Sequence, residues 1–216
     1  MITVVALDMA GTTVIDGGAV EQSFAEAFGT LGLTPTAAQV DHVRTTMGQS
    51  KIEVFRALLG EEEPARAATV AFEAAYDRRV REEGVRPIPG VEALFEDLRA
   101  RGTRICLTTG FSTSTRSMLL ERLGWDDLVD LALSPGDGIR GRPFPDLVLT
   151  AAMRLGAEDV RHVAVAGDTA SDLLAGTRAG ASIVAGVLTG AHDRAALEAA
   201  PHTHVLGSVV ELADHL

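Results

Sequence analysis

The pattern that most constrains the fold is an alternation of short apolar runs with helical segments, which starts at Gly90 and continues through the rest of the sequence. Apolar spacing predicts helices at 91–100, 112–123, 143–155, 170–179 and 208–215, and strands at 104–108, 128–133, 162–166, 182–187 and 204–206. An earlier apolar run, residues 2–7, adds a first strand. Strands that alternate with helices form a parallel sheet with helices on both faces, so we expect an α/β fold.

The segment between the first strand and Gly90 is predicted to be all helical. Helical spacing covers 18–31, 37–46, 51–59 and 63–83; Thr36 is suited to cap the second helix, and Ser50 with Glu53 has the form of a capping box for the third. We therefore expect a Rossmann-like core, residues 1–15 and 86–216, with an inserted helical cap domain, residues 16–85.

The amino-acid composition limits the classes of molecule that this protein can bind. The formal net charge is −11, which argues against nucleic acid and against anionic membranes, because both call for a basic surface. Apolar residues make up 46% of the 216 positions, yet no run of 18 apolar residues and no basic leader occurs. A cytoplasmic enzyme or binding protein is expected. The single cysteine, Cys106, excludes an internal disulfide.

Polar side chains collect where the predicted strands end. Asp8 follows the first strand, Thr109 the second and Asp168 a later one, with Asp172 one helical turn further. Carboxyl ends of parallel strands meet at one edge of a sheet, so these groups should converge there. Clustered carboxylates repel one another unless a cation lies among them, and oxygen ligands favour Mg²⁺. For Asp172 a helix-capping role is the alternative.

Lys51 stands out because the other 18 of the 19 basic residues are arginine. A solvated surface amine is the common role of lysine, and chance could leave one lysine in an arginine-rich chain. An amine, however, can lose its proton and attack a carbonyl, whereas a guanidinium stays charged. Lys51 also lies in the first turn of a predicted helix, where the helix dipole disfavours the ammonium form. A Schiff-base lysine is therefore a second interpretation.

Together these motifs resemble the haloacid dehalogenase superfamily. Its signature is a nucleophilic Asp in D-x-[D/A]-G-T, a Thr or Ser at the second strand end, a Lys or Arg, and an acidic G-D-x-x-x-D. The corresponding residues here are Asp8 to Thr12, Thr109, Arg142, and Gly167 to Asp172, in that order along essentially the whole chain.

The resemblance is strongest to the phosphonatase branch, the phosphonoacetaldehyde hydrolases, through DMAGTTV, MGQSKIEVFRAL, TTGFS and GRPFP. In that branch the cap lysine forms an imine with the substrate aldehyde, which selects Lys51 independently of composition. The branch also carries a His where this chain has Val54 and a Tyr where it has Phe111. Because these two positions differ, a related carbonyl phosphonate is as consistent with the resemblance as phosphonoacetaldehyde itself. The resemblance implies C–P bond hydrolysis of one of these substrates and a homodimer formed through the cap.

The resemblance also implies roles for individual residues. Asp8, Lys51, Thr109 and Arg142 would be catalytic. Asp8, Asp168, Asp172 and the Ala10 carbonyl would hold Mg²⁺, and Thr12, Met47, Gly48, Gly110 and Thr169 would contact substrate or phosphate.

Three other functions were weighed. A phosphomonoesterase of the same superfamily, acting on a small phosphorylated metabolite, is the alternative, although Ala10 replaces the Asp that usually protonates the leaving alkoxide. A dehalogenase is disfavoured because its chemistry uses no metal. A phosphoryl-binding regulatory protein is disfavoured because a binder needs no nucleophile.

Overall fold

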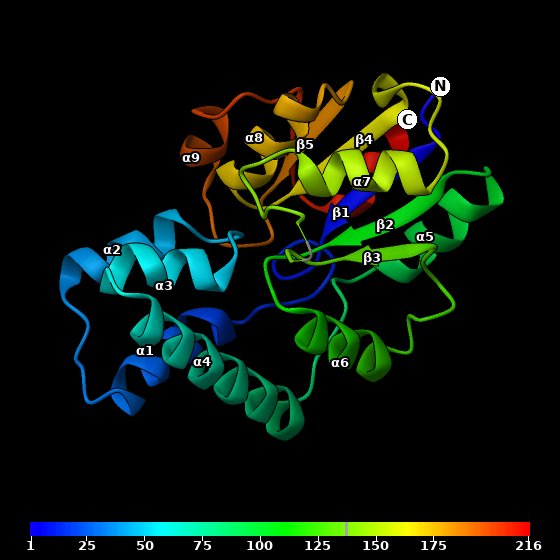
Figure 1. Cartoon of the computed structure of the whole chain (residues 1–216). Coiled ribbons are helices and arrows are strands. Elements are labelled where there is room, and N and C mark those ends of the chain that lie inside the picture. Colours follow the sequence, from blue (N-terminus) through cyan, green and yellow to red (C-terminus); the bar gives the residue numbers. More distant parts are fainter. Residues whose placement is uncertain (137) are drawn as a thin grey trace.

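The computed structural model describes residues 1–136 and 138–216. Within these residues the strands form one parallel sheet of order β3-β2-β1-β4-β5-β6. The strands are β1 (Val4–Asp8), β2 (Arg104–Thr108), β3 (Leu131–Leu133), β4 (Val163–Gly167), β5 (Ile183–Val187) and β6 (His204–Leu206). The chain order reverses beside β1, so the ends of β1, β2 and β4 lie next to one another (Figure 1). The α/β prediction is confirmed.

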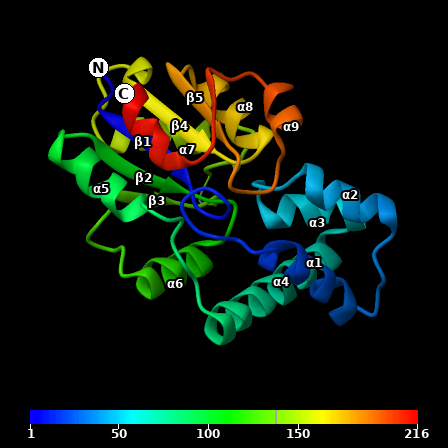
Figure 2. The same cartoon turned by 180° about the vertical axis from the view of Figure 1, so that it is seen from behind.

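Side chains of β1 alternate between the two faces of the sheet, as a pleated strand requires. Val5 and Leu7 pack in the cluster shared with α5 (Val91–Ala100) and η2 (Val209–His215), while Val4 and Ala6 pack against α7 (Asp146–Arg154) and α8 (Ala170–Ala179). Figures 1 and 2 show these helices on opposite faces. A strand buried on both faces accounts for the continuous apolar run at residues 4–7.

Helices α1 (Ala19–Thr30), α2 (Ala37–Thr45), α3 (Lys51–Leu59) and α4 (Glu62–Glu83) lie together beyond the sheet, and we call them the four-helix group (Figure 2). Rings of Phe24, Phe55 and Phe72 form its centre; the Phe24 centroid lies 4.9 Å from that of Phe55 and 4.7 Å from that of Phe72. The division at residues 15/16 and 85/86 stays a prediction, and the group occupies the predicted cap segment. Among the described residues, no helix has the length and apolarity needed to cross a membrane.

Most predicted elements occur with similar bounds, and the differences have local causes. The strand predicted at 128–133 is only Leu131–Leu133, because the Trp125 carbonyl accepts the amides of Leu128 and Val129 in a turn. Residues 209–215, predicted as a helix, are a 3₁₀ helix, and the predicted helix at 112–123 is α6 (Thr113–Leu123). The short helices η1 (Val160–His162) and α9 (Arg194–Glu198) were not predicted.

The two predicted caps had different outcomes. Thr36 does cap α2, in a capping box with Gln39. The capping box predicted at Ser50 is wrong, because the Ser50 side chain makes no cap bond and Glu53 pairs with Arg56.

Candidate active site

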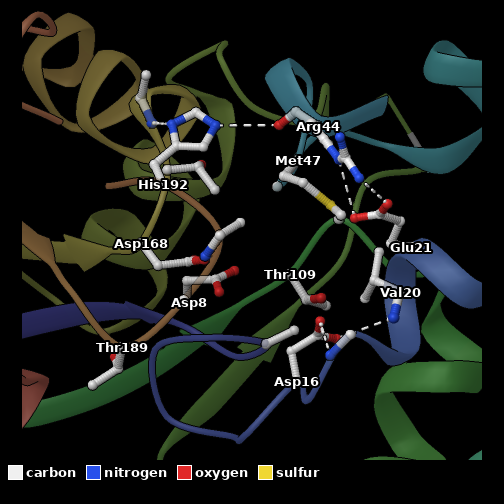
Figure 3. Close-up of a pocket in the computed structure, with 18 of the residues that line it drawn as sticks. Asp8, Asp16, Val20, Glu21, Arg44, Met47, Thr109, Asp168, Thr189 and His192 are labelled. Atoms are coloured by element: carbon white, nitrogen blue, oxygen red, sulfur yellow. Dashed lines mark hydrogen bonds and ion pairs between the residues drawn. The ribbon is translucent and has the colours of Figure 1, made fainter. Parts of the chain in front are cut away.

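The ends of three neighbouring strands bring Asp8, Thr109 and Asp168 to one cavity. Asp8 pairs with Thr108 in the sheet register, and Leu7 pairs with Ala166. The three strands therefore end at a similar level of the sheet, and the residues that follow them lie near one another. The cavity has a volume of about 770 Å³. Its wall includes nine of the predicted site residues: Asp8, Ala10, Met47, Gly48, Lys51, Thr109, Gly110, Asp168 and Thr169. Figure 3 shows Asp8, Asp168 and Thr109 in this cavity.

The turn after Asp8 packs against the carboxylate of Asp168. The Met9 carbonyl accepts the amides of Thr13 and Val14, which closes the turn. Gly11 has φ +88°, and a Cβ there would lie 2.5 Å from Asp168 Oδ2, so a side chain would collide with the carboxylate. Thr12 Oγ1 donates to Asp168 Oδ1 at 3.3 Å. Thr12 thus lies behind Asp168, and its predicted substrate contact stays a prediction.

Burial disfavours charge on both acids. Desolvation raises the pKa of Asp8 to about 6, with Arg142 opposing the shift and Asp172 adding to it. Desolvation, together with repulsion from Asp8 and Asp172, raises the pKa of Asp168 well above its usual value. The Ala191 amide, which donates to Asp168 Oδ2 at 2.7 Å, partly offsets this. Two buried like charges at one rim leave a place where a cation would be stabilising.

Arg142 and Asp172 lie outside the cavity wall and brace Asp8. Arg142 Nη1 donates to Asp8 Oδ1 at 2.5 Å and also pairs with Asp172 Oδ1. Asp172 Oδ2 accepts the backbone amide of Thr169 at 3.2 Å, so Asp172 has the helix-capping role. Direct ligation of a metal by Asp172 stays a prediction. Arg142 Nε and Nη2 lack partners among the described residues, which leaves donors for an anion.

The donor set fits Mg²⁺ through two carboxylates. Among the described residues, no group of three or more His, Cys, Asp or Glu side chains is arranged to hold a metal. Mg²⁺ commonly uses only one or two carboxylates and takes its other oxygens from water or phosphate. Asp8 and Asp168 would supply these carboxylates, and Ala10 on the same wall could add its carbonyl.

Lys51 is buried among aromatic rings on the four-helix side of the cavity. Its Nζ lies 5.1, 5.6 and 5.7 Å from the ring centroids of Phe111, Phe72 and Phe24, which we call the aromatic cage. The Gln49 carbonyl accepts from Nζ at 3.5 Å. Desolvation lowers the pKa of Lys51 to about 8; Arg142 adds to the shift, and Asp8, Asp16 and Asp168 oppose it. The side chain is only 6% exposed, so the surface interpretation is wrong.

Two glycines let the loop before α3 press against the strand-end loops. Gly48 has φ +82°, and a Cβ there would lie 2.7 Å from Thr169 Oγ1. A Cβ on Gly110 would lie 2.4 Å from the Gln49 carbonyl oxygen. This close approach places Lys51 on the same cavity as Asp8, although 43 residues separate them in sequence.

The two departures from the phosphonatase pattern have different positions. Phe111 lines the cavity and its ring centroid lies 4.5 Å from that of Tyr76. Val54 is buried in the core of the four-helix group and is absent from the cavity wall. Of these two positions, Phe111 alone lies on the cavity wall.

Several residues of the cavity wall were not predicted. Asp16 accepts the amides of Gly18 and Val20 and so caps the start of α1. The Asp-Gly-Gly sequence at 16–18 is a turn signal that could have located it. The pair Glu21–Arg44, 2.7 Å apart, and His192 join segments distant in sequence, and no local pattern indicates them.

Comparison with known proteins agrees with this geometry. The family model described as haloacid dehalogenase-like hydrolase matches residues 2–180. A phosphonoacetaldehyde hydrolase from Bacillus cereus is 30% identical over 208 residues, covering 89% of this chain and 78% of that protein.

Solved structures give the same result. A phosphonoacetaldehyde hydrolase-like protein from Oleispira antarctica has a TM-score of 0.86 at 25% identity, covering 99% of this chain and 91% of that one. A predicted phosphoglycolate phosphatase from Haemophilus somnus has a TM-score of 0.82 at 17% identity, covering 99% and 97%, a likeness of fold alone. Family match, strand-end motifs and fold together establish that this chain belongs to the haloacid dehalogenase-like hydrolases.

Proposed function

We propose that this hydrolase cleaves the C–P bond of phosphonoacetaldehyde or a related carbonyl phosphonate, using a Lys51 imine and an aspartyl phosphate on Asp8. The observation that carries the proposal is the placement of the only lysine, buried in an aromatic cage, on the same cavity as the strand-end aspartate. An ordinary phosphoryl transfer needs no amine there.

The environment of Lys51 suits attack on a carbonyl. Burial among rings disfavours the ammonium ion and holds the pKa near 8, so a useful fraction of the amine is neutral close to neutral pH. No carboxylate lies within ion-pair distance of Nζ among the described residues. Because the Lys51 ammonium ion has no ion-pair partner there, its buried site favours the neutral, nucleophilic amine.

Ala10 suits a carbon leaving group. It lines the cavity at the place where superfamily phosphatases usually carry an acid, so no side chain there can protonate a departing alkoxide. In a protonated imine the electrons of the breaking C–P bond pass into the C–N system and form an enamine. Such a leaving group needs no proton at the moment of cleavage.

The Lys51 amine condenses with the aldehyde, forms a C=N bond and releases water. Asp8 attacks phosphorus, the C–P bond breaks, and the enamine takes a proton at carbon to return to an imine. One water then releases acetaldehyde from Lys51, and another releases phosphate from Asp8.

Asp8 and Asp168 would hold Mg²⁺, which would supply positive charge for the phosphoryl oxygens. Arg142 keeps the Asp8 carboxylate in place, and its unpartnered Nε and Nη2 are further donors toward an anion. Thr109 Oγ1 accepts the Phe111 amide at 3.2 Å, which fixes its hydroxyl at the cavity wall, where it could donate to a phosphoryl oxygen.

Borohydride trapping tests the proposal. The protein is incubated with Mg²⁺ and phosphonoacetaldehyde, reduced, digested and analysed by mass spectrometry. We expect a reduced two-carbon adduct on Lys51 together with phosphate release. Lys51→Arg is the matched control, because it keeps the charge and cannot form the imine. Hydrolysis of a phosphomonoester with neither adduct nor phosphate from the phosphonate would instead establish the phosphomonoesterase alternative.

A further inference from the structure

The side-chain hydrogen bonds between the four-helix group and the rest of the described chain lead to the first turn of α8. Between residues 19–83 and the described residues of 86–216, two side-chain hydrogen bonds occur. Gln49 Nε2 donates to Ser171 Oγ at 3.3 Å. His192 Nε2 lies 3.3 Å from the Arg44 carbonyl oxygen, and its Nδ1 lies 3.1 Å from the Ala170 amide (Figure 3). Both connections therefore end at residues 170–171, directly after Asp168.

The partners of His192 fix its tautomer. A backbone amide can only donate, so Nδ1 accepts from Ala170 and the ring proton lies on Nε2. Nε2 then donates to the Arg44 carbonyl. One neutral imidazole thus bridges the last turn of α2 and the first turn of α8 with both nitrogens used.

The loop that carries His192 also holds Asp168. The Ala191 amide donates to Asp168 Oδ2 at 2.7 Å, and the His192 amide donates to the Asp168 carbonyl at 3.3 Å. A Cβ on Gly190 would lie 2.0 Å from Asp168 Oδ2, so this loop lies directly against the carboxylate. His192 is therefore connected to the acidic rim and to the four-helix group at once.

The chain passes between the two parts only near residues 15–18 and 84–87, where Gly17, Gly18 and Gly84 have positive φ. The Phe111 ring packs on Phe72 and Tyr76 between the two parts, and the two side-chain hydrogen bonds add directional contacts to this apolar packing. We propose that His192 is a positioning residue that holds the four-helix group, which carries Lys51, against the strand ends by bridging the Arg44 carbonyl to the Asp168 loop. The inference needs no substrate and is independent of the C–P cleavage proposal.

The sole lysine provides the test. Lys51 is 6% exposed, so its labelling by a bulky sulfonated succinimidyl ester reports opening, and the exposed amine of Met1 is an internal standard. Asn at 192 offers an oxygen near the Nδ1 position and retains the Ala170 contact without reaching Arg44. Gln offers an amide near the Nε2 position and retains the Arg44 contact. His192→Ala loses both, and His202→Ala, at an exposed histidine, is the matched control.

We expect His192→Asn and His192→Ala to label Lys51 about three- to tenfold faster, the effect of losing one hydrogen bond, with His192→Gln and His202→Ala close to wild type. Circular dichroism melting establishes that each variant is folded during labelling. A His192→Asn variant as protected as wild type, or a His192→Gln variant as reactive as His192→Ala, would overturn the proposal.

Discussion

The two sides of the cavity treat buried charge in opposite ways. On the sheet side, the carboxylates of Asp8 and Asp172 share the Arg142 guanidinium, and Asp168 has two hydrogen-bond donors. On the four-helix side, Lys51 Nζ is surrounded by rings and has one long hydrogen bond, 3.5 Å, to a backbone carbonyl. Burial shifts the pKa values of groups on both sides toward neutral pH, and the carboxylates of Asp8 and Asp172 have an ion-pair partner that Lys51 lacks among the described residues.

This difference indicates a division of work. A compensated carboxylate remains a charged nucleophile and metal ligand, which phosphoryl transfer requires whatever the leaving group. An uncompensated amine is useful only if its neutral form reacts. The sheet side should therefore serve any substrate with a phosphoryl group, whereas the four-helix side should decide whether a C–P bond is cleaved.

Replacing the nucleophile should have the largest effect. Asp8→Asn keeps the size of the side chain and removes its charge, so we expect both phosphonate and phosphate-ester hydrolysis to fall by at least about 10³-fold. Initial rates of phosphate release measure this. Substantial activity in this variant toward either substrate would remove Asp8 from the nucleophilic role.

Replacing the amine should affect one reaction only. For Lys51→Arg we expect C–P cleavage to fall by about 10³-fold or more, while residual phosphate-ester hydrolysis changes little. The same release assay with the two substrates gives the comparison. Equal losses for both substrates would mean that the division between the two sides is wrong.

Most of the fold was predictable because β1, β2 and β4 are buried runs followed by small or polar residues at their ends. Asp8, Thr109 and Asp168 lie at one edge because they follow parallel strands, and strand–helix alternation predicts a parallel sheet. Lys51 was identified from composition and family resemblance. Its burial was not, because the rings of Phe24, Phe72 and Phe111 come from three distant segments.

Long-range pairings account for what the sequence did not predict. Arg142 pairs with Asp8 and Asp172 across 134 and 30 residues, contacts that the sequence did not indicate, and its predicted catalytic role stays a prediction. His192 and the Glu21–Arg44 pair likewise depend on how the four-helix group is seated. The residues next to each of these side chains in the sequence do not indicate which distant residue it will contact.

Separating the two sides without changing either should have an intermediate effect. In Gly110→Ala the new methyl would lie 2.4 Å from the Gln49 carbonyl oxygen, so the loop before α3 must move away. We expect C–P cleavage to fall roughly 10- to 100-fold, because small misplacements of reacting groups cost about that much. Gly29→Ala, in α1 with no atom within 4 Å of the new methyl, is the control and should be silent. Unchanged cleavage in Gly110→Ala would show that the close approach is not needed.

Opening the aromatic cage to water should have the smallest effect, a shift of the Lys51 titration. Cyanate carbamylates only the neutral amine and is small enough to enter the cavity, so its rate at Lys51 should rise with pH to a midpoint of about 8 in the wild type. Removing the Phe111 ring in Phe111→Ala admits solvent, which favours the ammonium ion, so the midpoint should move up toward the ordinary lysine value near 10.4. The neighbouring Arg142, Asp8, Asp16 and Asp168 charges are unchanged in that variant. Phe28→Ala removes a ring that packs on Phe55 and has no contact with Nζ, so its midpoint should stay at the wild-type value. A fall of the midpoint in Phe111→Ala would show that the attraction of the ammonium ion to the Phe111 ring outweighs the exclusion of water by that ring.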